Sequence, residues 1–454
     1  MKMNRRSVLG LGSGRLSFAV AAGLACWWLA GCSSGSSNPL AAIQKAQAAN
    51  VGNFSNTIFL GDSLTAGFQS GSLLDTQQVH GWAPLVAKQA GFNIVQPLIA
   101  FPGAPNVLQL VSVNPLAIMQ YCGGTPCVTT TGRDNFATQV TDLAVPGAFV
   151  NDVANTIPMV NPTLGQQQIN QLVLGFPGLG YGLAQSQLQQ AINAQPTTIF
   201  LWIGNNDALI ADSTGMPSSM TSVANFTSQY QAMMQQLTTL TPAHLVIGNI
   251  PDVTQVPYLT PAALVLAQAS QETGYPTSVL SGILGIVPGD YVNPTGTAQV
   301  LPILTGTQKG PITDAGVLSA AEVVTVQAQV NSFNQVIAQA ATSAGATLVD
   351  INALFKQVST SGLTINGYTG TTAFLGGFFA LDGIHPTNTG YAVVANTFID
   401  TMNSKIGTKI PDVSLSSVAA ADPSWPPNLY APGVGDLGPM PTGAARGVEE
   451  LFKR

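Results

Sequence analysis

The chain contains a serine, a histidine and an aspartate whose settings suit nucleophilic catalysis. Ser63 stands in Gly61-Asp62-Ser63-Leu64, directly after the apolar run 57–60, and small residues follow where a helix could begin. This order predicts a hydroxyl on a turn at the carboxyl end of a strand, where open α/β folds bind ligands. A hydroxyl nucleophile also requires a neighbouring base, and that base requires a group that orients it.

The base can be chosen from only three histidines. His385 stands three residues after Asp382, and this short spacing lets the carboxylate reach Nδ1 while Nε2 stays free to accept a hydroxyl proton. His244 enters an apolar strand and suits the core, and nothing near His80 in the sequence would orient it. Ser63, His385 and Asp382 are therefore the candidate catalytic triad.

Acyl transfer also needs hydrogen-bond donors for the oxyanion that develops on the carbonyl oxygen. Gly147 follows a strand-like segment, and its amide can be approached closely because glycine has no side chain. Asn205 and Asn206 follow the apolar run 197–203 and bring side-chain amides to the same expected edge of the sheet. Each segment alone is an ordinary strand-to-loop turn, but the order of the segments along the chain is specific.

Taken in that order, the segments resemble the SGNH, or GDSL, hydrolase family over roughly residues 56–406. Gly61-Asp62-Ser63-Leu64 resembles the family's nucleophile block, and Asp382 with His385 resembles its acid and base block. The resemblance implies an α/β fold of the three-layer α/β/α flavodoxin-like type, with a central parallel sheet and loop insertions. It also implies ester hydrolysis without a metal or an organic cofactor.

The same resemblance implies the oxyanion hole. Gly147 takes the place of the oxyanion glycine and Asn206 that of the oxyanion asparagine, so the implied donors are Ser63, Gly147 and Asn206. Asn205 departs from the family pattern, because a second glycine is frequent at its position.

Strand-like and helical patterns alternate along the chain, which predicts a parallel sheet covered on both faces. The strand-like runs are 57–60, 93–100, 139–144, 197–203, 245–250 and 347–351. The helical patterns are 82–90, 223–240, 320–343 and 388–406.

We expect the hydrolase domain at residues 51–410. Within it, 101–133 and 256–314 break the alternation and are rich in Pro, Gly, Thr and apolar residues, so they are expected to be insertions over the sheet edge. Residues 411–454 are rich in Pro and Gly and are expected to be an extended tail, closed by one helical turn at most.

Residues 1–31 are expected to be a signal peptide. A basic start precedes the apolar stretch 16–30, which is too short to span a bilayer as a stable helix. Leu29-Ala30-Gly31-Cys32 resembles a bacterial lipobox, which implies cleavage before Cys32 and lipidation of Cys32. The protein would then be anchored to a membrane of the cell envelope, either the outer membrane or one facing the periplasm. Residues 32–50 would form a flexible tether. An ordinary signal peptide, which would give a secreted protein, is the alternative.

Of the four cysteines, Cys26 lies in the expected signal peptide and Cys32 at the lipidation site, which leaves Cys122 and Cys127. In an exported protein this close pair predicts a local disulfide. A metal site would need further ligands, and no histidine is near in sequence.

Charged residues make up only 7% of the chain and the net charge is −6, which argues against a nucleic-acid partner. We expect a monomer that acts on a small-molecule, lipid or acylated-glycan ester. The apolar insertions favour lipid or acyl esters. A carbohydrate O-acetylesterase is the alternative activity, and a surface-binding lipoprotein without turnover is an alternative of a different class.

Overall fold

The computed structural model describes residues 38–452, except for 114, 122, 124–130, 136–137, 160, 164, 176–183 and 430–439. The predicted signal peptide, the lipidation site Cys32 and the predicted disulfide between Cys122 and Cys127 lie outside the described residues. The chain from Pro39 onward forms one unit.

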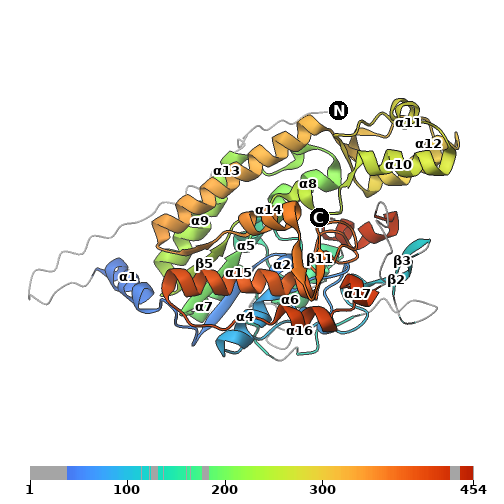
Figure 1. Cartoon of the computed structure of the whole chain (residues 1–454). Coiled ribbons are helices and arrows are strands. Elements are labelled where there is room, and N and C mark those ends of the chain that lie inside the picture. Colours follow the sequence, from blue (N-terminus) through green and yellow to red (C-terminus); the bar gives the residue numbers. More distant parts are fainter. Residues whose placement is uncertain are drawn as a thin grey trace, which may run out of the picture. The chain divides into compact units, whose positions relative to one another are not determined.

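A four-stranded parallel sheet with the strand order β1-β4-β5-β9 runs through the centre of this unit (Figure 1). Its strands are β1 (Thr57–Gly61), β4 (Thr198–Trp202), β5 (His244–Gly248) and β9 (Thr347–Val349). All residues of the first three strands are buried, as expected for a parallel sheet with both faces covered. The predicted central parallel sheet is confirmed.

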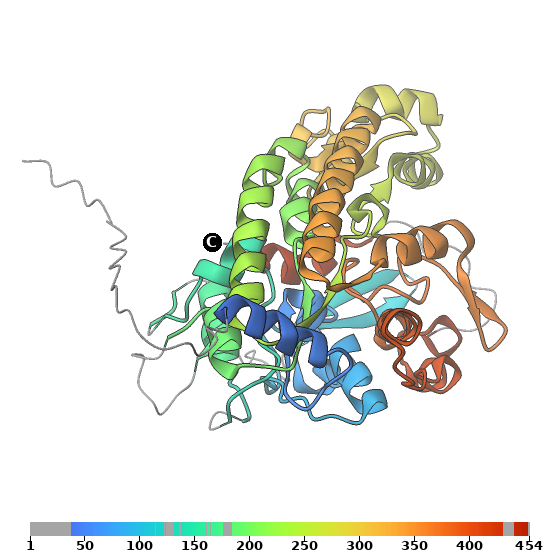
Figure 2. The ribbon, with the colours of Figure 1, turned by 90° about the vertical axis from the view of Figure 1, so that its left-hand side faces the viewer.

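Alternate side chains of the sheet enter two separate apolar layers. Leu60 and Leu201 belong to the layer that contains α7 (Gln187–Ala194), α9 (Val223–Leu240) and α13 (Ala320–Ala344). Phe59 and Phe200 stack at 4.7 Å between ring centroids in the other layer, with α4 (Trp82–Ala90) and α15 (Asn388–Ile406). Figures 1 and 2 show α9 and α13 side by side, away from α15, so the fold has three layers.

The other elements lie around these layers. The further helices are α1 (Pro39–Ala49), α2 (Ser63–Ala66), α3 (Asp75–Gln78), α5 (Val150–Asn155), α6 (Gly165–Leu174), α8 (Asn205–Thr214), α10 (Ala262–Thr273), α11 (Thr277–Leu284), α12 (Pro294–Leu304), α14 (Ile351–Ser361), α16 (Leu415–Ala421), α17 (Pro426–Leu429) and α18 (Arg446–Leu451). Short 3₁₀ turns are η2 (Pro217–Ser219), η3 (Val253–Gln255), η4 (Asp314–Gly316) and η5 (Thr442–Ala445).

Four of the predicted strand runs coincide with β1, β4, β5 and β9, and the four predicted helices coincide with α4, α9, α13 and α15. The run 139–144 is instead an irregular edge segment that pairs with β1 through the single bridge between Phe59 and Asp142. The Asp142 carboxylate accepts the Ala144 N–H at 3.2 Å, while the Leu143 and Val145 N–H groups donate to the β1 carbonyl oxygens of Phe59 and Gly61. The run 93–100 has only a bridge between Ile99 and Arg133.

The two predicted insertions have regular structure of their own. The first contains the hairpin of β2 (Leu108–Val113) and β3 (Leu116–Gln120). The second contains α10, α11 and α12 around a separate apolar cluster (Figure 1). Its strand β7 (Tyr291–Val292) pairs with β6 (Thr260–Pro261) on one side and with β8 (Val317–Leu318), just beyond the insertion, on the other. A second hairpin, β10 (Leu363–Ile365) with β11 (Tyr368–Gly370), precedes α15.

The segments expected to be a tether and an extended tail are partly helical. In the expected tether, α1 packs on α9, and the Gln47 side-chain amide donates to the carbonyl oxygens of Thr238 at 2.9 Å and Thr241 at 3.0 Å. Alanine-rich sequence favours this helix. In the expected tail, α16 packs on α15. Within the described residues, no helix is both long and apolar enough to cross a bilayer.

Candidate active site

Ser63 is the first residue of α2, on the turn that leaves β1. Only glycine fits at position 61 of this turn, because a Cβ there would lie 2.5 Å from Thr65 Oγ1 and 2.6 Å from the carbonyl oxygen of Trp202. Asp62 then caps the helix, and its Oδ1 accepts the Leu64 N–H at 3.0 Å. The predicted position of the serine on a turn at the carboxyl end of a strand of the parallel sheet is therefore found in the structure.

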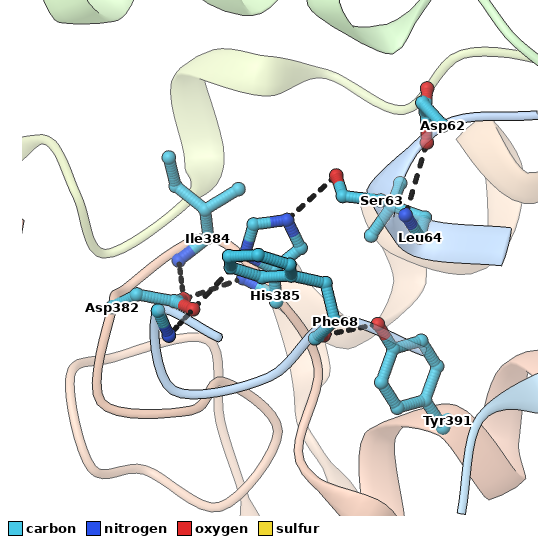
Figure 3. A network of polar contacts seen from close by, with 9 residues as sticks. Asp62, Ser63, Leu64, Phe68, Asp382, Ile384, His385 and Tyr391 are labelled. Atoms are coloured by element: carbon cyan, nitrogen blue, oxygen red, sulfur yellow. Dashed lines mark hydrogen bonds and ion pairs between the residues drawn. The ribbon is translucent and has the colours of Figure 1, made fainter. Parts of the chain in front are cut away.

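The three candidate triad residues form one chain of hydrogen bonds. His385 Nε2 lies 2.8 Å from Ser63 Oγ, and His385 Nδ1 lies 3.0 Å from Asp382 Oδ2 (Figure 3). Ser63 is 4% exposed and His385 1% exposed, so both hydrogen bonds are shielded from water. With Asp382 ionised, Nδ1 carries the proton and Nε2 is left to accept one from Ser63.

Asp382 accepts hydrogen bonds from three backbone amides in addition to the imidazole. The donors are Gly71 N–H at 2.6 Å, Ile384 N–H at 3.0 Å and His385 N–H at 2.9 Å. Burial disfavours the charged carboxylate, but the neighbouring His385 and these hydrogen bonds lower the pKa of Asp382 below its usual value. The carboxylate therefore stays ionised and holds the histidine in one orientation.

Phe68 packs against the imidazole, and Tyr391 holds the backbone of Phe68. The Phe68 ring lies against His385 with 4.6 Å between ring centroids (Figure 3). The buried Tyr391 hydroxyl donates to the Phe68 carbonyl oxygen at 2.6 Å, which joins α15 to the loop that follows α2. Sequence reasoning did not identify Phe68, Gly71 or Tyr391, because they come from segments without a motif and act only through tertiary contacts.

The predicted oxyanion segments are hydrogen-bonded to one another and to the serine turn. The Asn206 side-chain amide donates to the Ala148 carbonyl oxygen at 2.8 Å, and an amide nitrogen has a second hydrogen that this bond does not use. Gly147, next to Ala148, is buried and has a φ of +77°, which favours glycine. The Val145 N–H donates to the Gly61 carbonyl oxygen at 3.1 Å.

Asn205 has a different task from its neighbour. Its side-chain amide donates to Asp62 Oδ2 at 2.8 Å, which ties the start of α8 to the serine turn. Burial raises the pKa of Asp62 to about 6, although the hydrogen bond from Asn205 opposes this shift. The side chain at the position where the family often has glycine therefore stabilises a buried carboxylate.

Two glutamines that the sequence did not single out hold these turns in place. The buried Gln187 side chain both accepts from the Gly61 N–H and donates to the Gly61 carbonyl oxygen, each at 3.0 Å. The Gln166 amide donates to the Pro146 carbonyl oxygen at 2.7 Å, directly before Gly147. Both glutamines lie in polar helical stretches, which resemble an ordinary solvated helix when read from sequence.

An apolar pocket of about 90 Å³ lies beside the triad. Leu64, which follows Ser63, contributes to its wall, and so do Ile384 and Pro386, which flank His385. Val253 and Val256, from the segment after β5, also line it. Among the described lining residues most side chains are apolar, and the polar groups come from Asn205, Thr372 and the indole of Trp202. The pocket can therefore accommodate an alkyl group but offers little to a sugar.

Among the described residues, no group of three or more His, Cys, Asp or Glu side chains could hold a metal ion.

Comparison with known proteins gives one family match. The family model described as GDSL-like Lipase/Acylhydrolase matches residues 58–398, which include every candidate site residue described above. No curated protein matches the chain.

Solved structures with a similar arrangement have low sequence identity. An acetylxylan esterase from Geobacillus stearothermophilus is 11% identical, with a TM-score of 0.36, and the alignment covers 79% of this chain and 99% of that one. An alpha/beta hydrolase enzyme from the metagenome of Lake Arreo, Spain, is 13% identical, with a TM-score of 0.34 and coverage of 78% and 97%. The family assignment rests on the family model alone.

Proposed function

We infer that this chain, which belongs to the GDSL-like lipase/acylhydrolase family and is an ester-hydrolysing enzyme, uses Ser63 as its nucleophile. His385 is the general base, and Asp382 orients it. The observation that carries this proposal is the buried hydrogen-bond chain from Asp382 through His385 to Ser63. A base within hydrogen-bond distance of a hydroxyl, itself held by a carboxylate, is the arrangement that activates a serine.

In the proposed reaction, Ser63 Oγ attacks the ester carbonyl carbon while its proton passes to His385 Nε2. The carbonyl oxygen becomes an oxyanion. When it reforms the carbonyl, the C–O bond to the alcohol breaks, and the leaving alcohol takes the proton from His385. Water then attacks the carbonyl carbon of the acyl-enzyme while His385 takes its proton. Loss of the acid from Ser63 Oγ, which takes the proton back from His385, restores the enzyme. Asp382 stabilises the imidazolium that forms in each half.

The oxyanion would be held by the Ser63 and Gly147 backbone amides and the Asn206 side chain. No described residue accepts the Ser63 N–H, which lies in the first turn of α2, so this donor is available. The hydrogen bonds that join the serine turn to the segments of Gly147 and Asn206 support a fixed arrangement of these donors. Fixed donors stabilise developing charge better than mobile ones, because no reorganisation is needed during the reaction.

We propose an aliphatic acyl ester as the substrate. The apolar pocket beside the triad supports this choice, because it offers Val253, Val256 and Ile384 to an acyl chain. An acetyl group would leave most of this surface without a partner. Transfer of each methylene from water into such a pocket is worth roughly 0.8 kcal/mol.

The test is a series of p-nitrophenyl esters from acetate to hexadecanoate, assayed beside acetylated xylan. We expect kcat/KM to rise from acetate to a chain of medium length. Val256→Phe should fill part of the pocket and lower kcat/KM for the hexanoate by about tenfold, with the acetate value within about twofold of wild type. A preference for acetate or acetylated xylan in the unaltered protein would contradict the acyl assignment and favour a carbohydrate O-acetylesterase.

We also propose that lipid on Cys32 anchors the enzyme to a membrane of the cell envelope. The basic and apolar leader followed by Leu29-Ala30-Gly31-Cys32 supports this proposal.

A further inference from the structure

The C-terminal segment 440–452 returns to the body of the enzyme. It contains η5 and α18, and five of its apolar side chains are each at most 2% exposed: Met440, Ala444, Ala445, Val448 and Leu451. The same residues belong to the main apolar cluster of the fold. In Figure 1 the segment is red and lies between the helices of the second insertion and the β2–β3 hairpin.

This segment touches both ends of the candidate active site. A Cβ on Gly383, the residue after Asp382, would lie 2.5 Å from the Met440 sulfur. A Cβ on Gly147 would lie 2.8 Å from the Leu451 carbonyl oxygen. One short stretch of chain therefore packs against the loop of the triad acid and against the candidate oxyanion glycine.

Further contacts join the segment to the elements around the site. The rings of Phe452 and Phe149 meet edge to face, with 6.4 Å between centroids, and Phe149 begins the turn into α5. The 3₁₀ turn η5 contacts β3 in the first insertion and α12 in the second, while α18 contacts α6. The segment thus bridges both insertions at the candidate site.

The nucleophile is closed off in this arrangement. Ser63 is 4% exposed, and His385 beside it is 1% exposed. An ester must bring its carbonyl carbon to Ser63 Oγ, so some part of the surroundings has to move before reaction. Helix α18 has only six residues, too few to be stable on its own in water. Its order therefore depends on the packing of its apolar side chains against the rest of the enzyme.

We propose that residues 440–452 form a cover that closes the active site of the resting enzyme and must be displaced before an ester reaches Ser63. This inference rests on the proposed function of Ser63. The rate at which the site reacts is then scaled by the fraction of molecules in which the cover is open. Substitutions that weaken the cover, at positions away from the triad, raise that fraction.

The test measures access to position 63 without relying on catalysis. Ser63→Cys places a thiol at the nucleophile position, and its alkylation by iodoacetamide is followed by mass spectrometry of the peptide that carries it. The comparison is between Ser63→Cys alone and Ser63→Cys combined with Val448→Asp and Leu451→Asp. Burying two carboxylates under the cover is strongly unfavourable, so these two substitutions should detach it.

We expect alkylation to be at least about tenfold faster in the variant with the weakened cover. Val324→Asp is the matched control, because Val324 is a 64% exposed apolar residue of α13, and it should leave the rate unchanged. Thermal unfolding of each variant confirms that the body remains folded. A second form of the enzyme that ends at residue 429 lacks the cover and should react as fast as the weakened variant.

If the alkylation rate is unchanged or lower in both the weakened and the shortened forms, the proposal that residues 440–452 cover the active site is wrong. Failure of the proposed function would look different. With Ser63 intact, all forms would then lack esterase activity, whereas the alkylation rates would still report whether the segment restricts access.

Discussion

Asn205 and Asn206 are adjacent and both buried, yet their side chains bond to different partners. Asn206 donates to the Ala148 carbonyl oxygen beside Gly147, whereas Asn205 donates to the Asp62 carboxylate. The first contact suits a residue that supports an oxyanion hole. The second suits a residue that stabilises the turn carrying the nucleophile. Single substitutions can separate these two effects.

Asn206→Ala should lower kcat by about 10²–10³, with KM nearly unchanged, because a lost oxyanion donor weakens binding of the transition state alone. Asn205→Ala should chiefly lower stability, by roughly 1–3 kcal/mol, because it removes the side-chain donor to the buried Asp62 Oδ2. Steady-state kinetics and thermal unfolding of both variants give the comparison. A large loss of kcat in Asn205→Ala with a silent Asn206→Ala would overturn the oxyanion assignment.

At this scale the sequence identifies the residues with motif spacing and misses those that position them. Asp382 and His385 are close in sequence, so their contact could be predicted from spacing. The amide of Gly71, the ring of Phe68 and the hydroxyl of Tyr391 act across long sequence distances. Nothing in their local sequence distinguishes them from ordinary loop and core residues.

Among the elements, the edge segment beside β1 carries an unusual buried acid. Burial raises the pKa of Asp142 to about 8, although the Ala144 amide and the Gln96 side chain oppose this shift. Burial also raises the pKa of Asp207, on α8, to about 7. In an unfolded chain both carboxyls would lose their protons near pH 4. Unfolding between these limits therefore releases protons, and raising the pH favours the unfolded state.

We expect the melting temperature to fall as the pH rises from 6.5 to 8. The range begins at pH 6.5 because burial lowers the pKa of His244 from its ordinary value of 6.5. Below this pH the unfolded chain binds a proton at His244 more readily than the folded chain, so a rise in pH there favours the folded state. Burial also raises the pKa of Asp212 well above its ordinary value, so this carboxyl adds to the same slope. Asp142→Asn removes one of these buried carboxyls and should make the fall shallower. Calorimetry between pH 6.5 and 8 gives the melting temperature of both proteins. The same slope of melting temperature against pH in the variant and the parent would show that Asp142 does not titrate as described.

The sequence predicted correctly those helices and strands whose hydrophobic pattern follows from the local secondary structure alone. Strands buried on both faces, such as β4 and β5, consist mostly of apolar residues, and the buried side chains of α9 recur at helical spacing. From their Pro and Gly content, the segments 101–133 and 256–314 could be predicted only as insertions, and 411–454 only as an extended tail with one helical turn at most. Their short helices and hairpins are stabilised by contacts with distant parts of the chain, which local sequence does not reveal.

For the whole molecule, the proposed anchor predicts how the protein is distributed in its host. A chain with lipid on Cys32 should sediment with membranes, and Cys32→Ser should release it or leave an uncleaved precursor. Mass spectrometry of the mature amino terminus distinguishes these outcomes. An unmodified terminus at or after Cys32 would indicate a secreted enzyme and leave the catalytic proposal unchanged.

The central claim is that Ser63 is the nucleophile, and a fluorophosphonate probe tests it most directly, because such a probe reacts covalently with an activated serine. Incubation of the whole enzyme with the probe, followed by mass spectrometry of its peptides, should find one adduct, on Ser63. Ser63→Ala should abolish labelling and lower the rate of ester hydrolysis by about 10³-fold or more, while the variant remains folded. An adduct on another residue, or undiminished labelling of Ser63→Ala, would contradict the account.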